Sequence, residues 1–486
     1  MAIPTFYPLI HNEWIKTYKN IKVNNPYTGA TIAKVYLADG DFLDMAVESA
    51  LQGFQISRRL SGYERYDLLM KIAESIKKRA KELTDTIVTE SGKPVQFARV
   101  EVDRAQLTFQ WAAEEARRMG GEFFPLDIVP QTKGYFGIIR RFPRGVILGI
   151  SPFNFPLNLV AHKIAPAIAA GNSIILKPAS ATPLTAILLA DIIKSIPTPA
   201  GMVNIIPTSG KDAENLVKDG RIKKLSFTGS AQVGWYLRSL AGKKHVTLEL
   251  GGNAAVIVEA DTAIEEIIPR LVIGSFAYSG QICIAIQRIY VQEKIFDSFL
   301  EKFVDETIKR AVVGSPTDPH TVVGPMIDSA SARRTQNWIE DALKSGAKLV
   351  YGGKLTKNIL QPTILSNTTP DMKVVCEEIF APVVCIEPYN KFSDAIKMVN
   401  NSHYGLQAGV FTNNFQKIQK AYQEIEVGGV IINDYPTFRI DPMPYGGIKD
   451  SGMGREGIRF AMEEMSEIKL LAVKGIGSDE SHKANK

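Results

Sequence analysis

The stretch Gly145–Phe155, GVILGISPFNF, joins a short apolar run to a polar turn that contains Asn154. Four similar apolar runs follow before Gly252, and helical periodicity fills the intervals between them. Short strands that alternate with helices predict a parallel, doubly wound α/β sheet. The predicted strands are Val146–Ile150, Ser173–Leu176, Val203–Ile206, Leu225–Phe227 and Val246–Leu250.

The same alternation continues beyond the glycine pair at 251–252, so we expect a second α/β domain there. Upstream of the first sheet, helical periodicity predicts helices over 44–55, 63–92 and 95–119. The segment 134–144 alternates apolar and polar residues, which predicts a strand outside the main core. The expected division is a first domain of 1–120 and 145–251 and a second domain of 252–445.

Composition excludes several classes of protein. The 486 residues are 45% hydrophobic and 22% charged, and the net charge of +6 is spread along the chain. Basic clusters such as Lys77–Arg79 lack interleaved aromatic residues, so we expect no nucleic-acid partner. No window reaches the ~20 apolar residues of a membrane span, and no signal-peptide pattern is present, so we expect no membrane association. Three cysteines without metal-ligand spacing suit a reducing, cytoplasmic location and predict no metal site.

Polar residues gather where the predicted strands of the first sheet end. Asn154 offers an amide, Lys177 a cation and Glu249 a carboxylate, and parallel sheets bind ligands beyond these strand ends. Cys283 follows a flexible turn in the segment GSFAYSGQICIA, between a predicted helix and a predicted strand. These four side chains can therefore meet in one cleft.

Together these groups support covalent chemistry on a carbonyl compound. A thiolate at Cys283 attacks the carbonyl, while the Asn154 amide and the backbone N–H of Cys283 hold the resulting oxyanion. The Glu249 carboxylate then activates water to release an acyl group from sulfur. Taken singly, each signal has a structural alternative, because an isolated cysteine is more often a buried small hydrophobe. A glutamate at a strand end is likewise more often a helix cap or an ion-pair member.

The turn Phe227–Gly234 lies between a predicted strand and a predicted helix. Backbone N–H groups and a helix N-terminus in this position can bind a phosphate anion. Alternatively, Ser230 simply caps the helix, and the turn alone does not separate these two interpretations.

Seven segments, taken together, resemble the ordered motifs of the aldehyde dehydrogenase superfamily. They fall within roughly residues 140–460, and the lactaldehyde, succinate semialdehyde and non-phosphorylating glyceraldehyde-3-phosphate dehydrogenase branches are similar. The segments are Phe153–Pro156 (FNFP), Leu176–Pro178 (LKP), Phe227–Ser230 (FTGS), Leu248–Gly252 (LELGG), Gly280–Cys283 (GQIC), Glu377–Pro382 (EEIFAP) and Tyr445–Lys449 (YGGIK).

The resemblance implies oxidation of a small aldehyde to its carboxylic acid with NAD(P). Cys283 forms a thiohemiacetal and then a thioester, Asn154 stabilises the oxyanion, and Glu249 is the general base. The resemblance also implies that the first domain binds the dinucleotide and that the second is catalytic. Residues 121–144 and 460–486 would form a small β flap that joins subunits into a homodimer or homotetramer. Because no acidic residue occupies position 180, we favour NADP over NAD. The implied cofactor-binding residues are Ile150, Ser151, Pro152, Phe153, Lys177, Ala179, Ser180, Gly210, Phe227, Thr228, Gly229, Ser230, Val233, Leu250, Gly251, Glu378 and Phe380.

The expected substrate residues include three potential cations. They favour a small aldehyde that carries a carboxylate or phosphate, although each arginine is equally suited to a surface ion pair. The chain departs from the family pattern at Phe153, Ile282 and Ala381, where tryptophan, arginine and glycine are usual. The isoleucine removes a cation beside the nucleophile, so neutral hydroxyaldehydes such as lactaldehyde stay open. The expected substrate residues are Arg104, Phe155, Leu159, His162, Ile282 and Arg439.

Two other functions remain as alternatives. In a CoA-acylating aldehyde dehydrogenase the thioester passes to CoA instead of water, and such enzymes tend to lack the base present here at Glu249. A catalytically silent binding protein on the same fold would not need Cys283, Glu249 and Asn154 together.

Overall fold

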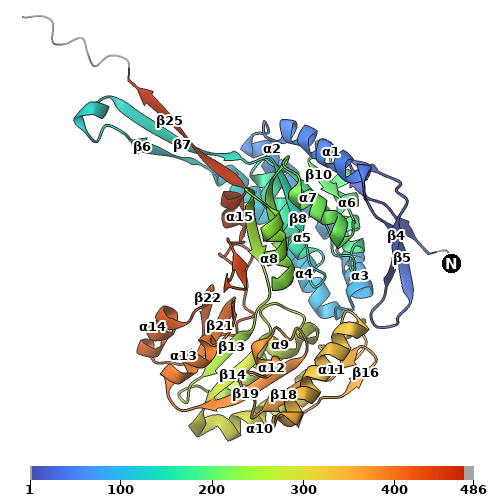
Figure 1. Ribbon diagram of the computed structural model, residues 1–486, viewed down its shortest axis with the longest axis vertical. Coiled ribbons are helices and arrows are strands. Elements are labelled where there is room, and N and C mark those ends of the chain that lie inside the picture. The colour runs from blue at the N-terminus through green and yellow to red at the C-terminus, as the bar shows by residue number, and fades with distance from the viewer. Residues whose placement is uncertain (1–2, 476–486) are drawn as a thin grey trace, which may run out of the picture.

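The computed structural model describes residues 3–475, and its first lobe is built on an eight-stranded sheet of order β24-β12-β11-β8-β9-β10-β2-β3 (Figure 1). The five central strands are parallel, and the order of strands along the chain reverses between β8 and β11. Ligands of doubly wound sheets bind at such a reversal, beyond the carboxyl ends of the strands. These strands are β8 (Val146–Ile150), β9 (Ser173–Lys177), β10 (Val203–Ile205), β11 (Ile222–Thr228) and β12 (His245–Glu249).

Helices cover both faces of this sheet because alternate strand residues point to opposite sides. Ile147 and Ile174 pack with one group of helices, whereas Val146 and Ile175 pack with the other. The first group is α2 (Gly62–Lys78), α3 (Ala80–Ser91), α4 (Val95–Arg118), α5 (Asn158–Ala169) and α6 (Leu184–Lys194). The second group is α1 (Asp41–Ser57), α7 (Gly210–Lys218) and α8 (Ala231–Leu240).

The second lobe holds a seven-stranded sheet of order β15-β18-β19-β14-β13-β21-β22, which is parallel except at the edge strand β15. Its strands are β13 (Ala254–Val258), β14 (Ile286–Gln292), β15 (Lys348–Tyr351), β18 (Thr363–Ser366), β19 (Val383–Tyr389), β21 (Gln407–Phe411) and β22 (Gly429–Ile432). Its helices are α9 (Ile264–Phe276), α10 (Phe296–Arg310), α11 (Ser329–Lys344), α12 (Lys373–Cys376), α13 (Phe392–Asn400) and α14 (Phe415–Glu424).

Short strands complete the two lobes. At the N-terminus, β1 (Thr5–Phe6), β4 (Asn20–Asn24) and β5 (Thr31–Tyr36) form a small sheet, while β2 (Leu9–Ile10) and β3 (Glu13–Trp14) extend the first large sheet. Two pairs lie elsewhere: β16 (Leu355–Thr356) with β17 (Ile359–Leu360), and β20 (Tyr404–Gly405) with β23 (Ile448–Lys449).

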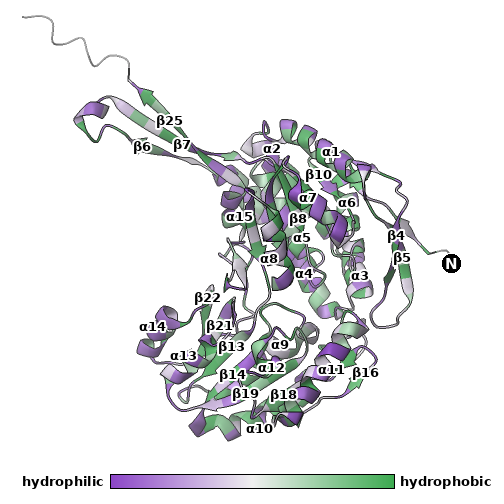
Figure 2. Cartoon of the chain, viewed as in Figure 1, coloured by the Kyte–Doolittle hydropathy of each residue, from purple (hydrophilic) through white to green (hydrophobic). Residues whose placement is uncertain are grey.

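A three-stranded antiparallel arm projects away from the first lobe (Figure 1). It consists of β6 (Gly121–Pro125), β7 (Tyr135–Pro143) and β25 (Ser466–Lys474), with β7 in the centre. Phe123, Ile468 and Leu471 are exposed on it, and hydrophobic positions run along its strands in Figure 2. Exposed apolar residues grouped in this way mark a contact surface.

The predicted α/β fold with two parallel sheets is confirmed, and five predicted strands of the first sheet appear within two or three residues of their expected bounds. The helix predicted over 63–92 is two helices, which separate at Arg79. The Arg79 guanidinium forms ion pairs with Glu82 in α3 and with Asp191 in α6, so the junction between α2 and α3 is held against helix α6.

The expected flap segment 460–486 needs a correction at its start. Helix α15 (Ile458–Glu464) packs into the core of the first lobe, where Met462 is buried, and only the following β25 joins the arm. The short strand β24 (Gly452–Met453) also returns to the first sheet, beside β12. Residues 476–486 of the expected flap lie outside the described residues. Across residues 3–475, none of the helices combines the length and apolarity needed to cross a membrane.

Candidate active site

Cys283 follows a backbone turn of unusual conformation. In the 3₁₀ turn η2 (Ala277–Gly280), Tyr278, Ser279 and Gly280 have φ values of 51°, 56° and 66°. Residues other than glycine adopt this left-handed region only at an energetic cost, so surrounding contacts must hold the turn. The Ser279 hydroxyl donates to the Gly324 carbonyl at 2.8 Å, and a Cβ on Gly280 would lie 2.2 Å from the Ala381 carbonyl oxygen. The turn is therefore locked by its neighbours immediately before the cysteine.

The Cys283 thiol is half-buried between the lobes. Its Sγ lies 3.0 Å from the hydroxyl oxygen of Tyr445, and burial raises the pKa of Cys283 to about 11. The Asn154 side-chain amide donates to the Gln281 carbonyl at 2.9 Å, two residues before the cysteine. The side chain predicted to bind the oxyanion, Asn154, is therefore hydrogen-bonded to the backbone of the segment that carries the predicted nucleophile, Cys283.

Glu249 is buried at the end of β12. Within residues 3–475, neither carboxylate oxygen has a hydrogen-bond partner. Burial, and then the nearby carboxylate of Glu456, raises the pKa of Glu249 well above its usual range. An unpartnered buried carboxylate is costly, and such groups are concentrated at functional sites.

Two cavities meet at these residues. One has a volume of about 410 Å³ and the other about 210 Å³. A larger groove of about 960 Å³ lies between the N-terminal strands and helices α3 and α6, and none of the predicted site residues lines it. The side chains common to both smaller cavities are Leu159, Thr228, Glu249, Leu250 and Cys283. The nucleophile and the base therefore stand where the two cavities join.

The larger of these two cavities contains most of the predicted cofactor residues. It is also lined by residues of the second lobe that the sequence interpretation missed, namely Gln281 and four residues just before or within the start of helix α11. That helix begins at Asp328, whose side chain accepts from the Ser331 backbone N–H at 2.7 Å, and this helix start was the available signal. The predicted residues that line the cavity are Ile150, Ser151, Pro152, Phe153, Ala179, Phe227, Thr228, Gly229, Ser230, Val233, Leu250, Gly251, Glu378 and Phe380. The missed residues are Gln281, Met326, Ile327, Ser331 and Arg334.

Three predicted cofactor residues do not line this cavity. The Lys177 ammonium is buried and donates to the adjacent Pro178 carbonyl at 3.0 Å, and burial lowers the pKa of Lys177 to about 8. Ser180 is exposed beyond the end of β9, and Gly210 begins helix α7. Lys177 ends strand β9, Ser180 follows that strand, and Gly210 follows strand β10, but none of the three lines the cavity.

The cavity fits a phosphate-bearing dinucleotide. Helix α8 starts after Ser230 without a side-chain cap, so its first N–H groups are free to bind an anion. The buried Ser151 hydroxyl has no partner in the described part of the chain. A Cβ on Gly251 would lie 2.4 Å from a carboxylate oxygen of Glu378, whose other oxygen accepts from the Gly252 N–H at 3.0 Å. The lack of a side chain at Gly251 therefore leaves room for the Glu378 carboxylate to pack against the backbone of residues 251–252.

The smaller cavity contains five of the six predicted substrate residues, namely Arg104, Phe155, Leu159, Ile282 and Arg439. His162 does not line it. The imidazole is buried behind the cavity with Nε2 2.8 Å from a carboxylate oxygen of Asp441, and burial, followed by the charge of Arg439, lowers the pKa of His162. A neutral histidine adds no positive charge for a substrate, so its expected role is corrected to a structural contact.

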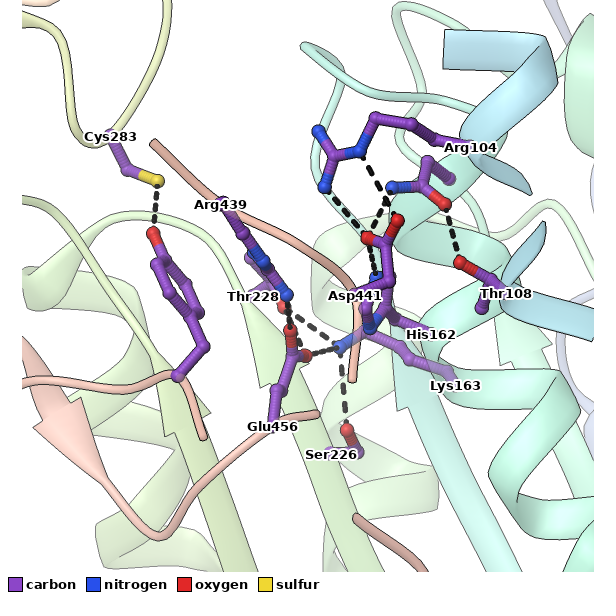
Figure 3. Close-up of polar contacts among 12 residues, drawn as sticks. Arg104, Thr108, His162, Lys163, Ser226, Thr228, Cys283, Arg439, Asp441 and Glu456 are labelled. Carbon is purple, nitrogen blue, oxygen red and sulfur yellow. Dashed lines mark hydrogen bonds and ion pairs between the residues drawn. The ribbon is translucent and has the colours of Figure 1, made fainter. Parts of the chain in front are cut away.

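Figure 3 shows that Asp441 is the centre of one part of a polar network. Its carboxylate accepts from the Arg104 guanidinium at 2.7 Å, from His162, and from the Asn158 amide at 3.2 Å. Burial opposes ionisation of Asp441, but the hydrogen bonds from His162 and Arg104 and the charge of Arg104 outweigh it and lower the pKa. The substrate-facing arginine is therefore held in position by a permanently charged partner.

Glu456 is the centre of the other part of this network. Its carboxylate lies 3.4 Å from the Lys163 ammonium and 3.1 Å from the Arg439 guanidinium (Figure 3). Burial acts to raise the pKa of Glu456, but the charges of Lys163 and Arg439 outweigh it and lower the pKa. The Arg439 guanidinium also lies 3.7 Å from the ring centre of Tyr445.

A buried pair of Lys93 and Glu101 completes the charged wall of the cavity. The charged side chains that line the cavity are three basic residues, Lys93, Arg104 and Arg439, and three acidic residues, Glu101, Glu249 and Glu456. Both arginine side chains border the same space as Cys283. The cavity can therefore offer a small substrate charged hydrogen-bond donors.

A cysteine and a buried carboxylate at the junction of a dinucleotide-sized cavity and a small charged cavity are typical of a cofactor-dependent oxidoreductase with a covalent intermediate. The model of the Aldehyde dehydrogenase family matches residues 14–471, and the chain belongs to this family. The family predicted from the seven motifs is therefore confirmed.

Relatives support the same assignment. The chain is 42% identical to the 3-sulfolactaldehyde dehydrogenase of Priestia aryabhattai over 465 residues, which cover 96% of this chain and 97% of that protein. Aldehyde dehydrogenase 21 of Physcomitrella patens, solved with the reaction product succinate, is 42% identical with a TM-score of 0.96, covering 98% of this chain and 100% of that one. The glyceraldehyde-3-phosphate dehydrogenase GapN of Methanocaldococcus jannaschii, solved with NADP, is 38% identical with a TM-score of 0.90, covering 95% and 100%.

Proposed function

We propose that this aldehyde dehydrogenase oxidises a small aldehyde that carries an anionic group to its carboxylic acid, with NADP in preference to NAD. The observation that carries the proposal is the position of Arg104 and Arg439, whose guanidinium groups line the same small cavity as Cys283 and Glu249. The two similar proteins named for sulfolactaldehyde and solved with succinate are associated with anionic molecules, which supports this substrate class.

In the proposed reaction, the Cys283 thiolate adds to the aldehyde carbon and forms a thiohemiacetal. The Asn154 amide and the Cys283 backbone N–H donate to the oxygen that becomes negative. When bound in the larger cavity, the nicotinamide cofactor supplies the acceptor for the hydride that leaves this carbon. The acyl group then remains on sulfur as a thioester.

Glu249 completes the proposed cycle. Its unpartnered carboxylate takes a proton from water, the hydroxide attacks the thioester carbonyl, and the Cys283 thiolate leaves as the carboxylic acid forms. The raised pKa of Glu249 suits this role, because a general base works best when its pKa lies near the operating pH.

The preference for NADP rests on the region around Lys177 and Ser180. A carboxylate beside the adenosine ribose repels a 2′-phosphate, and the exposed Ser180 leaves this position uncharged. The NADP bound to the similar glyceraldehyde-3-phosphate dehydrogenase supports the same choice.

Two wider features belong to this proposal. The lobes act as dinucleotide-binding and catalytic domains, and the arm of β6, β7 and β25 joins copies of the chain into a homodimer or homotetramer through its exposed apolar residues. The three free cysteines fit the reducing environment of the cytoplasm.

The test is a panel of aldehydes with NAD or NADP, followed by the absorbance of the reduced nicotinamide. Succinate semialdehyde, glyceraldehyde 3-phosphate, lactaldehyde and acetaldehyde span the anionic and neutral classes. We expect the highest kcat/KM with an anionic aldehyde and NADP; equal kcat/KM for neutral aldehydes would contradict the substrate class. Addition of CoA should leave the rate unchanged, because the buried Glu249 supports hydrolysis of the thioester.

A further inference from the structure

Within residues 3–475, the hydroxyl group of Tyr445 has one hydrogen-bond partner, which is the sulfur of Cys283 at 3.0 Å. The tyrosine is buried, and its backbone is fixed by two hydrogen bonds with Glu456, at 3.1 Å and 2.7 Å. The Arg439 guanidinium stacks on its ring at 3.7 Å from the centre. The position of this hydroxyl is therefore set by the backbone and by a charged contact on the ring.

The sulfur needs a stabilising partner because its other surroundings oppose ionisation. Burial disfavours the thiolate, and the carboxylates of Glu378 and Glu249 disfavour it further, while Arg439 favours it. The neighbouring Ile282 is apolar and adds no charge. A thiolate in these surroundings has few sources of stabilisation.

We propose that Tyr445 is a further catalytic residue, whose hydroxyl donates a hydrogen bond to the Cys283 thiolate and thereby increases the fraction of enzyme that is ready to attack the aldehyde. This inference rests on the proposed role of Cys283 as the nucleophile. In the thiol form either atom can donate, whereas in the thiolate form only the tyrosine can. The hydrogen bond therefore favours the charged form selectively.

Two contacts keep the tyrosine suited to this role. Burial raises the pKa of Tyr445 well above its usual range, so the hydroxyl keeps its proton and remains a donor at the pH at which the thiol ionises. The stacked Arg439, itself paired with Glu456, fixes the ring so that little conformational freedom is lost when the hydrogen bond forms.

The test measures the ionisation of Cys283 without aldehyde or cofactor. The rate of alkylation by iodoacetamide is followed against pH in the wild type and in Tyr445→Phe, with the modified cysteine identified by peptide mass. We expect the midpoint for Cys283 to rise by about one unit or more in the variant, which is about tenfold slower alkylation at a fixed pH below both midpoints. Tyr389→Phe is the matched control, because it removes another buried tyrosine hydroxyl, which donates to the Val258 carbonyl at 3.3 Å.

An unchanged or lowered midpoint in Tyr445→Phe overturns the proposal. A second measurement keeps the hydroxyl group. In Tyr445→3-fluorotyrosine the phenol is more acidic and is a stronger hydrogen-bond donor, so we expect the alkylation midpoint of Cys283 to fall below that of the wild type. A rise there also overturns the proposal. Alkylation requires no turnover, so the two tests are independent. Failure of the aldehyde panel would contradict the proposed function, whereas an unchanged alkylation midpoint in Tyr445→Phe would contradict only the role of Tyr445.

Discussion

The two cavities that meet at Cys283 differ in how their polar groups are satisfied. In the small cavity, most charged groups are paired: Lys93 with Glu101, Arg104 with Asp441, and Arg439 with Glu456. The exception is the Nε of Arg439, which has no hydrogen-bond partner within residues 3–475. In the larger cavity, the Ser151 hydroxyl has no hydrogen-bond partner and helix α8 starts without a side-chain cap, as far as residues 3–475 show.

The difference shows how each ligand is recognised. A large cofactor with many polar atoms can supply the missing partners itself, so the protein leaves them open. A small aldehyde offers few contacts, and its cavity must be rigid before it binds. Glu249 lies at the junction of the two cavities and resembles the polar groups of the larger one, because neither of its carboxylate oxygens has a hydrogen-bond partner among the described residues.

Replacing this open carboxylate is expected to have the largest effect. Glu249→Gln keeps the shape of the junction but removes the base, so steady-state kcat should fall by about 10²- to 10⁴-fold. The first turnover should remain fast, with one equivalent of reduced cofactor formed per active site in stopped-flow absorbance. The control is Glu259→Gln, which changes another buried carboxylate that pairs with Lys417 in the second lobe and should leave kcat per folded molecule unaltered.

Loss of a paired cation in the small cavity is expected to have a more selective effect. Arg104→Gln should reduce kcat/KM for an anionic aldehyde by about 10- to 100-fold, since it removes a charged hydrogen-bond donor. For acetaldehyde the change should stay within about threefold, because no charge is recognised. Arg221→Gln, which breaks a surface network with Asp44, Glu48 and Asp219, serves as the matched arginine control. Equal losses for both aldehydes would mean that Arg104 is purely structural.

The pH dependence should reflect the junction between the cavities. The pKa values of Cys283 and Glu249 are both raised, mainly by burial, and both groups act in their deprotonated forms. As pH falls, Cys283 gains a proton and cannot attack the aldehyde, so kcat/KM should rise by about tenfold per pH unit on the acid side. Protonation of Glu249 should instead lower kcat, because it blocks hydrolysis of the thioester. A profile of kcat/KM that is flat from pH 6 to 9 would contradict these assignments.

The smallest expected effect concerns the outer end of the cofactor site. Ser180→Asp introduces a negative charge near the expected 2′-phosphate, so KM for NADP should rise by about tenfold. KM for NAD in the same variant is the internal control and should change by less than about twofold. If the two KM values rise together, Ser180 does not lie at the phosphate.

Local sequence signals were sufficient for the strands and for the residues directly after them. Val146–Ile150 and Val95–Met119 were predicted almost to their observed ends, because strand length and helical period are encoded in neighbouring residues. The same signals predicted that Glu249 ends a strand, and its carboxylate does lie beside Cys283 in both cavities.

Contacts between distant residues carried no comparable signal. Arg104 and Asp441 are 337 positions apart, and Tyr445 reaches Cys283 across 162 positions. Glu456 lies in a segment that resembles an ordinary polar turn, yet it is buried because strand β24 and helix α15 return to the first lobe. These pairings depend on topology, which residue periodicity does not encode.

The central claim is that an acyl group rests on Cys283 until Glu249 activates water. The most direct measurement is the mass of Glu249→Gln after mixing with NADP and an anionic aldehyde, followed by acid quenching and peptide mapping. We expect the peptide containing Cys283 to gain the mass of the acyl group, in an amount equal to the reduced cofactor formed. Formation of reduced cofactor with no acyl group on Cys283 would contradict this claim.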